Sequence, residues 1–150
     1  MSGVSQALKI AVSSDHAAHE LRAEVRAWLV DQGHEVTDLG PAVGESVDYP
    51  DRALPVAMGV ADGRYDRGVL LCGTGQGMAM TANKVAGVRA AVVSDVFSAR
   101  MAMLHNDARV LCMGQRVVGA GVALECLAGW LAAEFEGGRH ARRVGKIVTP

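Results

Sequence analysis

A cysteine followed at once by a glycine-rich loop is the most chemically suggestive feature of this chain. Residues 69–77 read Val-Leu-Leu-Cys-Gly-Thr-Gly-Gln-Gly, so an apolar run ends at Cys72 and a loop rich in glycine follows. Glycines let the backbone turn sharply and aim several N–H groups at one point. The N-terminus of a helix behind such a loop favours negative charge. A thiol beside this loop therefore pairs a base with an oxyanion site, as proton transfer through an enediolate requires.

The same loop could activate the thiol. The thiolate is the reactive form of cysteine, and a helix N-terminus with aimed amides favours it. These groups would also stabilise the oxyanion that forms when a proton leaves carbon. The alternative is a buried structural thiol, which is the interpretation we keep for Cys112 and Cys126 because both lie among aliphatic residues.

Two other ligand classes use similar loops. Dinucleotide sites carry G-x-G-x-x-G after the first strand, whereas this chain has G-x-G-x-G after its third expected strand and lacks the acidic residue expected for ribose. Flavin carriers use aromatic side chains to sandwich the cofactor, and this chain has only two Trp, two Tyr and two Phe. We therefore expect no cofactor. The three cysteines lack the spacing of metal ligands, so we expect no metal either.

Strand and helix patterns alternate along the chain without a hairpin signal. The expected strands and helices are, in order, strand 8–13, helix 17–32, strand 34–39, helix 51–62, strand 67–72, helix 77–86, strand 88–93, helix 95–104, strand 108–113 and helix 119–135. This order predicts a three-layer α/β/α sandwich with Rossmann-like topology and about five parallel strands. We expect a single domain over 1–150, with an irregular N-terminus at 1–7 and a basic C-terminal segment at 137–150. His19 and His34 are expected on the surface.

Parallel sheets of this kind bind ligands at the carboxyl ends of the strands. Asp15-His16 and 72–77 would lie on that rim, whereas His105-Asn106-Asp107 and Arg139 to Arg143 would lie on the opposite rim. If all of them serve one pocket, a partner subunit must supply the second group. The sequence thus predicts a site at a dimer interface.

The basic segment near the C-terminus suits a phosphate group. Arg139 and Arg143 are four residues apart and share one face of a helix, while Arg142 points elsewhere. The guanidinium fork binds phosphate well, although a basic run is more often a solvated face. No set of stacking aromatics accompanies it, so we expect no nucleic-acid partner.

Composition excludes several classes of protein. Half of the 150 residues are apolar, 21% are charged and the net charge is −1, so no global charge attracts nucleic acid or anionic lipid. No apolar run approaches the roughly 20 residues that span a bilayer, and the first residues lack the regions of a signal peptide. An odd number of cysteines, three, argues against a disulfide framework. We expect a cytoplasmic protein without a membrane partner.

Taken together, the motifs identify a family. The chain resembles type B ribose-5-phosphate isomerases, of the family that includes galactose-6-phosphate isomerase subunits. The motifs that carry the resemblance run in order along nearly the whole chain: Ser14-Asp15-His16-Ala17, Asp48-Tyr49-Pro50, Cys72-Gly73-Thr74-Gly75-Gln76-Gly77, Ala82-Asn83-Lys84, His105-Asn106-Asp107, Gly114-Gln115-Arg116-Val117-Val118-Gly119 and Glu136-Gly137-Gly138-Arg139-His140.

The resemblance implies a metal-independent enzyme of the pentose phosphate pathway that works as a homodimer or tetramer. Some members carry serine in place of the cysteine and a glutamate six residues later; this chain has Met78 there and belongs to the cysteine branch. The resemblance implies that Cys72 is the base and that the enediolate is held by the backbone amides of Gly73, Thr74, Gly75, Gln76 and Gly77. It implies that the sugar ring is opened by Asp15, Thr74 and His105, and that the sugar is contacted by Asn83 and Asn106. The implied phosphate contacts are His16, Arg139 and Arg143, with Arg116 as a further candidate.

The implied reaction is the interconversion of ribose 5-phosphate and ribulose 5-phosphate. Allose 6-phosphate, galactose 6-phosphate and erythrulose 4-phosphate are alternative substrates, because the sequence does not give the length of the pocket. A phosphosugar-binding domain without catalysis is a further alternative, disfavoured because Cys72 and Thr74 are both present.

Overall fold

A parallel sheet forms the middle layer of the computed structural model, which describes residues 6–148. Within those residues the sheet has five strands in the order β2-β1-β3-β5-β4, and every neighbouring pair is parallel. The strands are β1 (Lys9–Ser14), β2 (Glu35–Asp38), β3 (Arg67–Cys72), β4 (Ala90–Val92) and β5 (Val110–Gly114). The predicted Rossmann-like sheet is confirmed.

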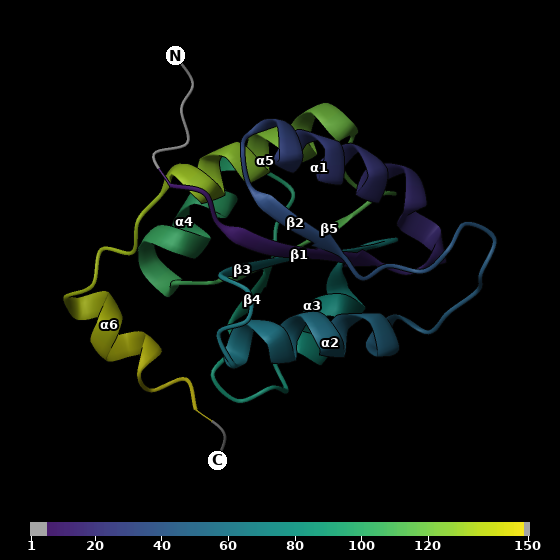
Figure 1. Ribbon diagram of the computed structural model, residues 1–150. Helices are drawn as coiled ribbons and strands as arrows, with labels where there is room; N and C mark the ends of the chain where they lie inside the picture. Colours follow the sequence, from purple (N-terminus) through teal and green to yellow (C-terminus); the bar gives the residue numbers. More distant parts are fainter. Residues whose placement is uncertain (1–5, 149–150) are drawn as a thin grey trace.

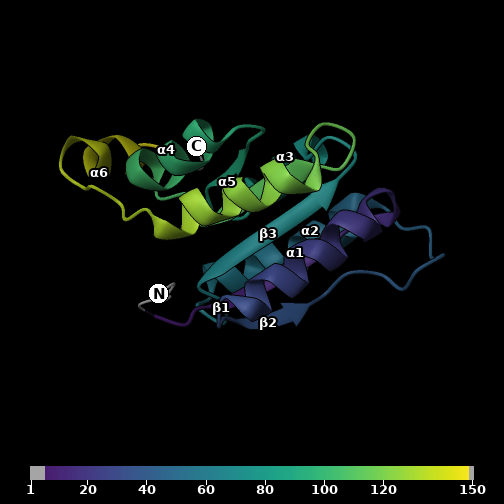
Figure 2. The ribbon, with the colours of Figure 1, turned by 90° about the horizontal axis from the view of Figure 1, so that it is seen from above.

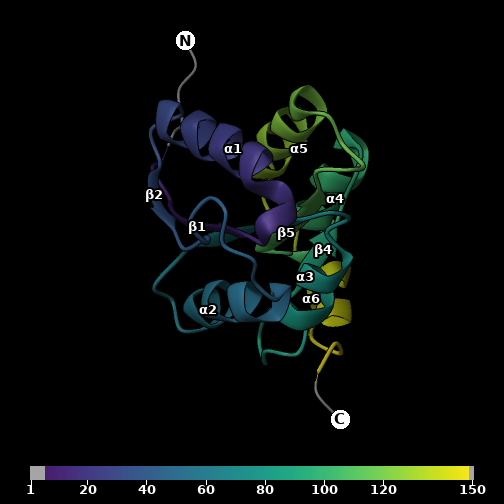
Figure 3. The same cartoon turned by 90° about the vertical axis from the view of Figure 1, so that its right-hand side faces the viewer.

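Helices cover both faces of the sheet (Figure 1). The helices are η1 (His16–Ala18, a 3-10 turn), α1 (His19–Asp31), α2 (Tyr49–Ala61), α3 (Gln76–Ala82), α4 (Val96–Asn106), α5 (Ala120–Ala132) and α6 (Arg139–Val144). Helices α1, α4 and α5 pack on one face, and α2 and α3 pack on the other, as the view along the sheet in Figure 3 also shows. The three predicted layers are therefore present.

The central strands are apolar on both faces because helices cover both faces. Along β3, Val69 and Leu71 join the core under α1, α4 and α5, whereas Leu70 and Cys72 join the core under α2 and α3. Successive strand residues point to opposite faces. The Cys72 side chain therefore points toward the α2–α3 layer.

Several boundaries differ from the prediction, and each difference has a local cause. Helix α3 ends at Ala82 rather than at residue 86, because the Asn83 carboxamide binds the backbone N–H and carbonyl of Ala90 and Gly87 follows with a positive φ of 85°. Helix α4 continues through Asn106, and Asp107 ends it in the left-handed conformation (φ 46°). His105 and Asn106 thus belong to the last turn of α4 rather than to the loop after it.

The prediction that His34 lies on the surface is wrong. His34 precedes β2 and is only 7% exposed, and its Nδ1 accepts a hydrogen bond from the backbone N–H of Leu8 at 3.1 Å. This bond joins the entry of β2 to the entry of β1. A single histidine in a polar context gives no sequence signal for such a contact.

The C-terminal segment projects from the sandwich and forms α6, which contacts α4. Seen from above in Figure 2, α6 lies at the end of the molecule away from the arrowhead of β3. Most of the expected irregular segment 1–7, and residues 149–150, lie outside the described residues. Between residues 6 and 148, no helix is long and apolar enough to cross a bilayer.

Candidate active site

The carboxyl ends of β1 and β3 form the rim that carries the predicted base. The chain passes from β1 to β2 on one side and then crosses to β3 on the other, so this is the switch point of the sheet. Ser14 pairs with Leu71, and the backbone N–H of Asp15 donates to the carbonyl of Leu71 at 3.2 Å. Asp15 and Cys72 therefore leave adjacent strands side by side, as predicted.

The Cys72 thiol lies at the mouth of the glycine loop. Its side chain is nearly buried, and the backbone N–H of Gly75 donates to its Sγ at 3.0 Å. Gly75 has a φ of 84°, and a Cβ there would come within 2.9 Å of the Met113 backbone. Only glycine allows the turn that aims this amide at sulfur. The Gly75 amide thus places a hydrogen-bond donor directly beside the predicted base.

The rest of the loop is exposed to solvent at Thr74 and Gln76, and the ring of Tyr49 covers it at Gly77. Thr74 and Gln76 are exposed, and the backbone N–H of Gln76 donates to the Thr74 hydroxyl at 3.3 Å. Any side chain at Gly77 would collide with the ring of Tyr49, which thus forms a wall of the loop. Tyr49 was not among the predicted site residues, although the Asp48-Tyr49-Pro50 motif contained it.

Arg116 lies beside the loop because β5 is the neighbour of β3. Gly114 pairs with Cys72, and the Arg116 backbone N–H donates to the carbonyl of Gly73 at 3.1 Å. The Arg116 side chain passes close to Gly73, whose missing Cβ would be 3.7 Å from the Arg116 Cδ. The exposed guanidinium of Arg116 is therefore available to a ligand over the loop.

Asp15 and His16 occupy the turn after β1. The Asp15 carboxylate caps η1 by accepting the backbone N–H of Ala17 at 2.9 Å, so the predicted helix over 17–32 begins with a 3-10 turn. The Nδ1 of His16 lies 3.2 Å from both the carbonyl and the N–H of Val47. This contact places the loop over 40–47 beside the rim, which no sequence signal indicated.

The Asn83 side chain, predicted to contact the sugar, also binds the backbone of its own chain. Its carboxamide donates to the Ala90 carbonyl and accepts the Ala90 N–H, each at 2.9 Å. One lone pair and one hydrogen of the amide stay free. Contact between Asn83 and a sugar therefore remains a prediction.

The other predicted residues lie at the far end of the molecule. His105 and Asn106 end α4, and Arg139 and Arg143 are exposed on α6. Figure 2 shows this end and the arrowhead of β3 on opposite sides of the chain. A single subunit does not bring these residues to the Cys72 loop, as the topology predicted.

His105 has close neighbours at that end. Its imidazole stacks on that of His140, with ring centroids 4.1 Å apart and planes inclined by 7°. The Glu136 Oε1 lies 3.6 Å from the His105 Nε2 and 3.4 Å from the His140 Nε2. Burial, followed by the positive potential of His105 and Arg139, lowers the pKa of His140. Neither His140 nor Glu136 was among the predicted site residues.

The two other cysteines differ from Cys72. Burial raises the pKa of Cys112, which is fully enclosed in β5, and burial also raises the pKa of Cys126 in α5. Both thiols are held in the protonated, unreactive form. This agrees with their predicted structural role.

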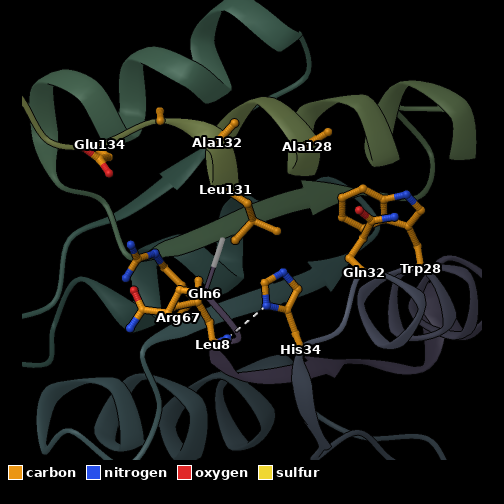
Figure 4. A pocket seen from close by; sticks show the side chains of 11 residues that line it. Gln6, Leu8, Trp28, Gln32, His34, Arg67, Ala128, Leu131, Ala132 and Glu134 are labelled. Atoms are coloured by element: carbon orange, nitrogen blue, oxygen red, sulfur yellow. Dashed lines mark hydrogen bonds between the residues drawn. The ribbon is translucent and has the colours of Figure 1, made fainter. Parts of the chain in front are cut away.

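A cavity of about 410 Å³ opens between α1 and α5, at the start of β1 and β3 (Figure 4). Trp28, His34, Arg67, Leu131 and Glu134 are among the residues that line it. Among the described residues that form its wall there is no predicted site residue. The cavity lies at the opposite ends of the strands from Cys72 and is separate from the rim that carries the glycine loop.

Several proteins of known sequence that resemble this chain are named as sugar-phosphate isomerases. The ribose-5-phosphate isomerase B of Escherichia coli (strain K12) is 48% identical over 141 residues, which cover 94% of this chain and 95% of that protein. A D-erythrulose-4-phosphate isomerase of Pectobacterium atrosepticum is 45% identical over 141 residues, covering 93% of each.

Solved structures give the same result for the fold. A structure of Clostridium thermocellum ribose-5-phosphate isomerase B superimposes with a TM-score of 0.91 at 52% identity, covering 93% of this chain and 94% of that one. A ribose 5-phosphate isomerase from Thermotoga maritima gives 0.92 at 44% identity, with 95% and 99% covered. Residues 10–147 match the family described as Ribose/Galactose Isomerase. The chain belongs to this Ribose/Galactose Isomerase family.

Proposed function

We propose that the protein is an aldose–ketose isomerase that interconverts ribose 5-phosphate and ribulose 5-phosphate. The observation that carries the proposal is the Gly75 N–H aimed at the Cys72 Sγ at the mouth of a loop rich in amide donors. The names of relatives that are 48% and 52% identical support the same substrate.

In the proposed reaction, the Cys72 thiolate removes the proton from C2 of the open-chain aldose. The electron pair forms the enediolate, and the carbonyl oxygen at C1 takes up negative charge. The loop amides other than that of Gly75, which donates to the Cys72 Sγ, would face that charge, since donors placed where charge develops stabilise the transition state. The proton is then delivered to C1, while the hydroxyl proton of O2 moves to O1, so that O2 becomes the ketone oxygen and O1 a hydroxyl group. The hydrogen moves as a proton between adjacent carbons, so no step requires a redox cofactor.

The remaining rim residues would prepare the substrate. Asp15 and Thr74 flank Cys72 and are proposed to open the sugar ring together with His105, whose imidazole would act as the proton carrier. Asn83 and Asn106 are proposed contacts to the sugar, and Gln76 and Gly77 complete the row of amides. His16, with Arg116 beside the loop, is a proposed contact to the phosphate end.

We propose that the complete site forms between two copies of the chain. Cys72 and His105 lie at opposite ends of one subunit, and Arg139 and Arg143 lie beside His105 on the exposed helix α6. A two-fold dimer brings one end of each chain to the other end of its partner and builds two equal sites. The assembly is thus a homodimer, or a tetramer of two such dimers, that takes a sugar phosphate in the cytoplasm as part of the pentose phosphate pathway.

A second phosphosugar is the alternative substrate. The relative at 45% identity is named for erythrulose 4-phosphate, and it covers this chain as fully as the ribose-5-phosphate relatives do. The deciding experiment measures kcat/KM in the presence of EDTA for ribose 5-phosphate and for the phosphates of erythrulose, allose and galactose. Ribose 5-phosphate should give the highest value. Preference for another sugar would correct the substrate, and bound phosphosugar without turnover of any would reject the enzyme.

A further inference from the structure

The end of the molecule that carries His105 holds a compact cluster of metal-binding side chains. His105 comes from the last turn of α4, Glu136 from the segment after α5, and His140 from α6. One ligand atom from each of the three lies within 4.8 Å of the other two. Three elements that are separate in sequence thus converge on one point.

The donor set and its spacing suit a divalent transition metal. Two imidazoles and one carboxylate form a known set of Zn²⁺ ligands. With metal–ligand bonds of about 2.0–2.1 Å, neighbouring ligand atoms of a tetrahedral site lie about 3.3 Å apart. The Glu136 Oε1 lies 3.4 Å and 3.6 Å from the two histidine Nε2 atoms, close to that spacing.

The His140 imidazole has an unused ligand atom. The side chain is only 9% exposed, and its Nε2 is closed off from solvent and makes no hydrogen bond within residues 6–148. A buried polar atom without a partner is costly and calls for an explanation. An ion between His140 and Glu136 would supply that partner.

The backbone holds the three residues in place. The Glu136 N–H donates to the carbonyl of Leu104, and the His140 N–H donates to the carbonyl of Gly137, both at 3.0 Å. Gly137 has a φ of 70°, in the left-handed region, so the turn that aims Glu136 at the histidines suits glycine. The two rings are parallel with centroids 4.1 Å apart, so the rings must tilt apart before both Nε2 lone pairs point at a common ion.

We propose that His105, Glu136 and His140 form a binding site for a divalent transition metal ion such as Zn²⁺, and that the bound ion inhibits the enzyme. Binding follows from the cluster alone. Inhibition rests on the proposed function, because an ion on the Nε2 of His105 removes that imidazole from ring opening. Arg139 and Arg143 add positive charge nearby, so the Glu136 carboxylate is essential for holding a cation.

The test measures metal binding directly, in the absence of sugar. The assembled protein is stripped with a chelator, dialysed and titrated with Co²⁺ by absorption spectroscopy and with Zn²⁺ by calorimetry. We expect one ion per chain, with cobalt d–d bands and no thiolate charge-transfer band. Glu136→Gln and His140→Ala should each weaken binding about tenfold or more, the scale of a lost ligand contact.

Matched controls separate this site from other donors. Glu134→Gln removes a carboxylate two residues from Glu136, and Cys72→Ser removes the thiol that competes for soft metals. Both should leave the metal affinity unchanged. Circular dichroism checks the fold of every variant, and the isosteric Glu136→Gln decides the question if His140→Ala does not fold.

Affinity that survives both Glu136→Gln and His140→Ala, or that disappears in Cys72→Ser, overturns the inference. Absence of binding at micromolar metal also overturns it. Because the readout needs no substrate, a protein that binds metal at the cluster but isomerises no sugar phosphate would reject the proposed function alone. Zn²⁺ inhibition that persists unchanged in Glu136→Gln would reject the proposed inhibition alone.

Discussion

The backbone N–H of Gly75 donates to the Sγ of Cys72 across 3.0 Å, and this contact joins the last residue of β3 to the loop that begins α3. One loop thereby meets two chemical needs. In the proposed reaction, the Gly75 amide lies beside the base and the other amides of the loop would face the oxyanion. Cys112 lies on the adjacent strand with no such donor and stays protonated.

Replacing Cys72 by serine tests the base. A serine hydroxyl is a far weaker acid than a thiol, and Met78 stands where other family members carry the alternative base, so Cys72→Ser should lower kcat by about 10²–10⁴-fold. The fold and the binding of phosphosugar should persist, since the two side chains are similar in size. Steady-state kinetics and a thermal melt check both points. Cys112→Ala is the control and should keep its turnover; near-normal turnover in Cys72→Ser would exclude this base.

Much of the fold could be predicted because its signals are local. Strand 67–72 carries the apolar run Val69 to Cys72 and is bounded by a glycine loop, and its predicted limits coincide with β3. The end of α3 could not be predicted, since it depends on hydrogen bonds between Asn83 and Ala90 across a turn. His34 was misplaced for the same reason, because its partner Leu8 is 26 residues away.

The sequence predicted the position of some residues of the candidate site but not the contacts among others. The rule for parallel sheets placed Asp15 beside Cys72 and His105 at the opposite end, and the structure agrees. The stacking of His105 on His140 depends on how α6 folds back against α4, which no periodicity encodes. The sequence pattern predicts where helices and strands lie, but it does not predict contacts between distant segments, such as the contact of α6 with α4.

Arg139 should bind the phosphate of the substrate. It is exposed on α6 and lies four residues from Arg143, so the two guanidinium groups share one face. Loss of a hydrogen bond between charged groups costs about 1.5–3 kcal/mol, so Arg139→Ala should raise KM for the sugar phosphate about 10- to 100-fold. The free sugar should be affected far less. KM and competition measurements with both forms provide the check.

Arg142 offers the matched control for that experiment. It is also exposed on the same short helix, but it precedes Arg143 by one residue and so projects about 100° away from it around the helix axis. Arg142→Ala should change KM little. Equal effects of the Arg139 and Arg142 changes, or equal effects on free and phosphorylated sugar, would assign the basic helix a structural role instead.

If the site is shared between two chains, mixing two inactive variants should restore part of the activity. Cys72→Ala and His105→Ala should each be nearly inactive alone, because every site contains one of the two defects. In a mixed dimer with two-fold symmetry, one site contains both substitutions and the other contains neither. About half of the dimers in a random mixture are mixed, so the mixture should recover up to about a quarter of normal activity. The measurement follows activity after dissociation and reassociation, with subunit exchange verified by mass spectrometry of differently labelled chains. Verified exchange without recovery would place the complete site within one chain.

His34 should make the fold sensitive to acid. Burial lowers the pKa of His34 below its usual value of 6.5, and its unprotonated Nδ1 accepts the Leu8 N–H. The unfolded chain therefore binds a proton more readily than the folded chain as the pH falls. The contribution of His34 to stability is complete above about pH 6.5 and is lost as the pH falls toward the lowered pKa of the folded state.

His34→Asn isolates this effect, because the Asn Oδ1 lies close to the position of the histidine Nδ1 and can accept the same N–H without titrating. Urea unfolding from pH 8 to pH 5 should show the wild-type protein losing about 1 kcal/mol more stability than the variant, the value of one hydrogen bond. The pKa of His140 is also lowered, but it affects both proteins equally and cancels in the difference. Parallel curves of stability against pH would mean that the Leu8–His34 hydrogen bond contributes nothing measurable to the stability of the fold.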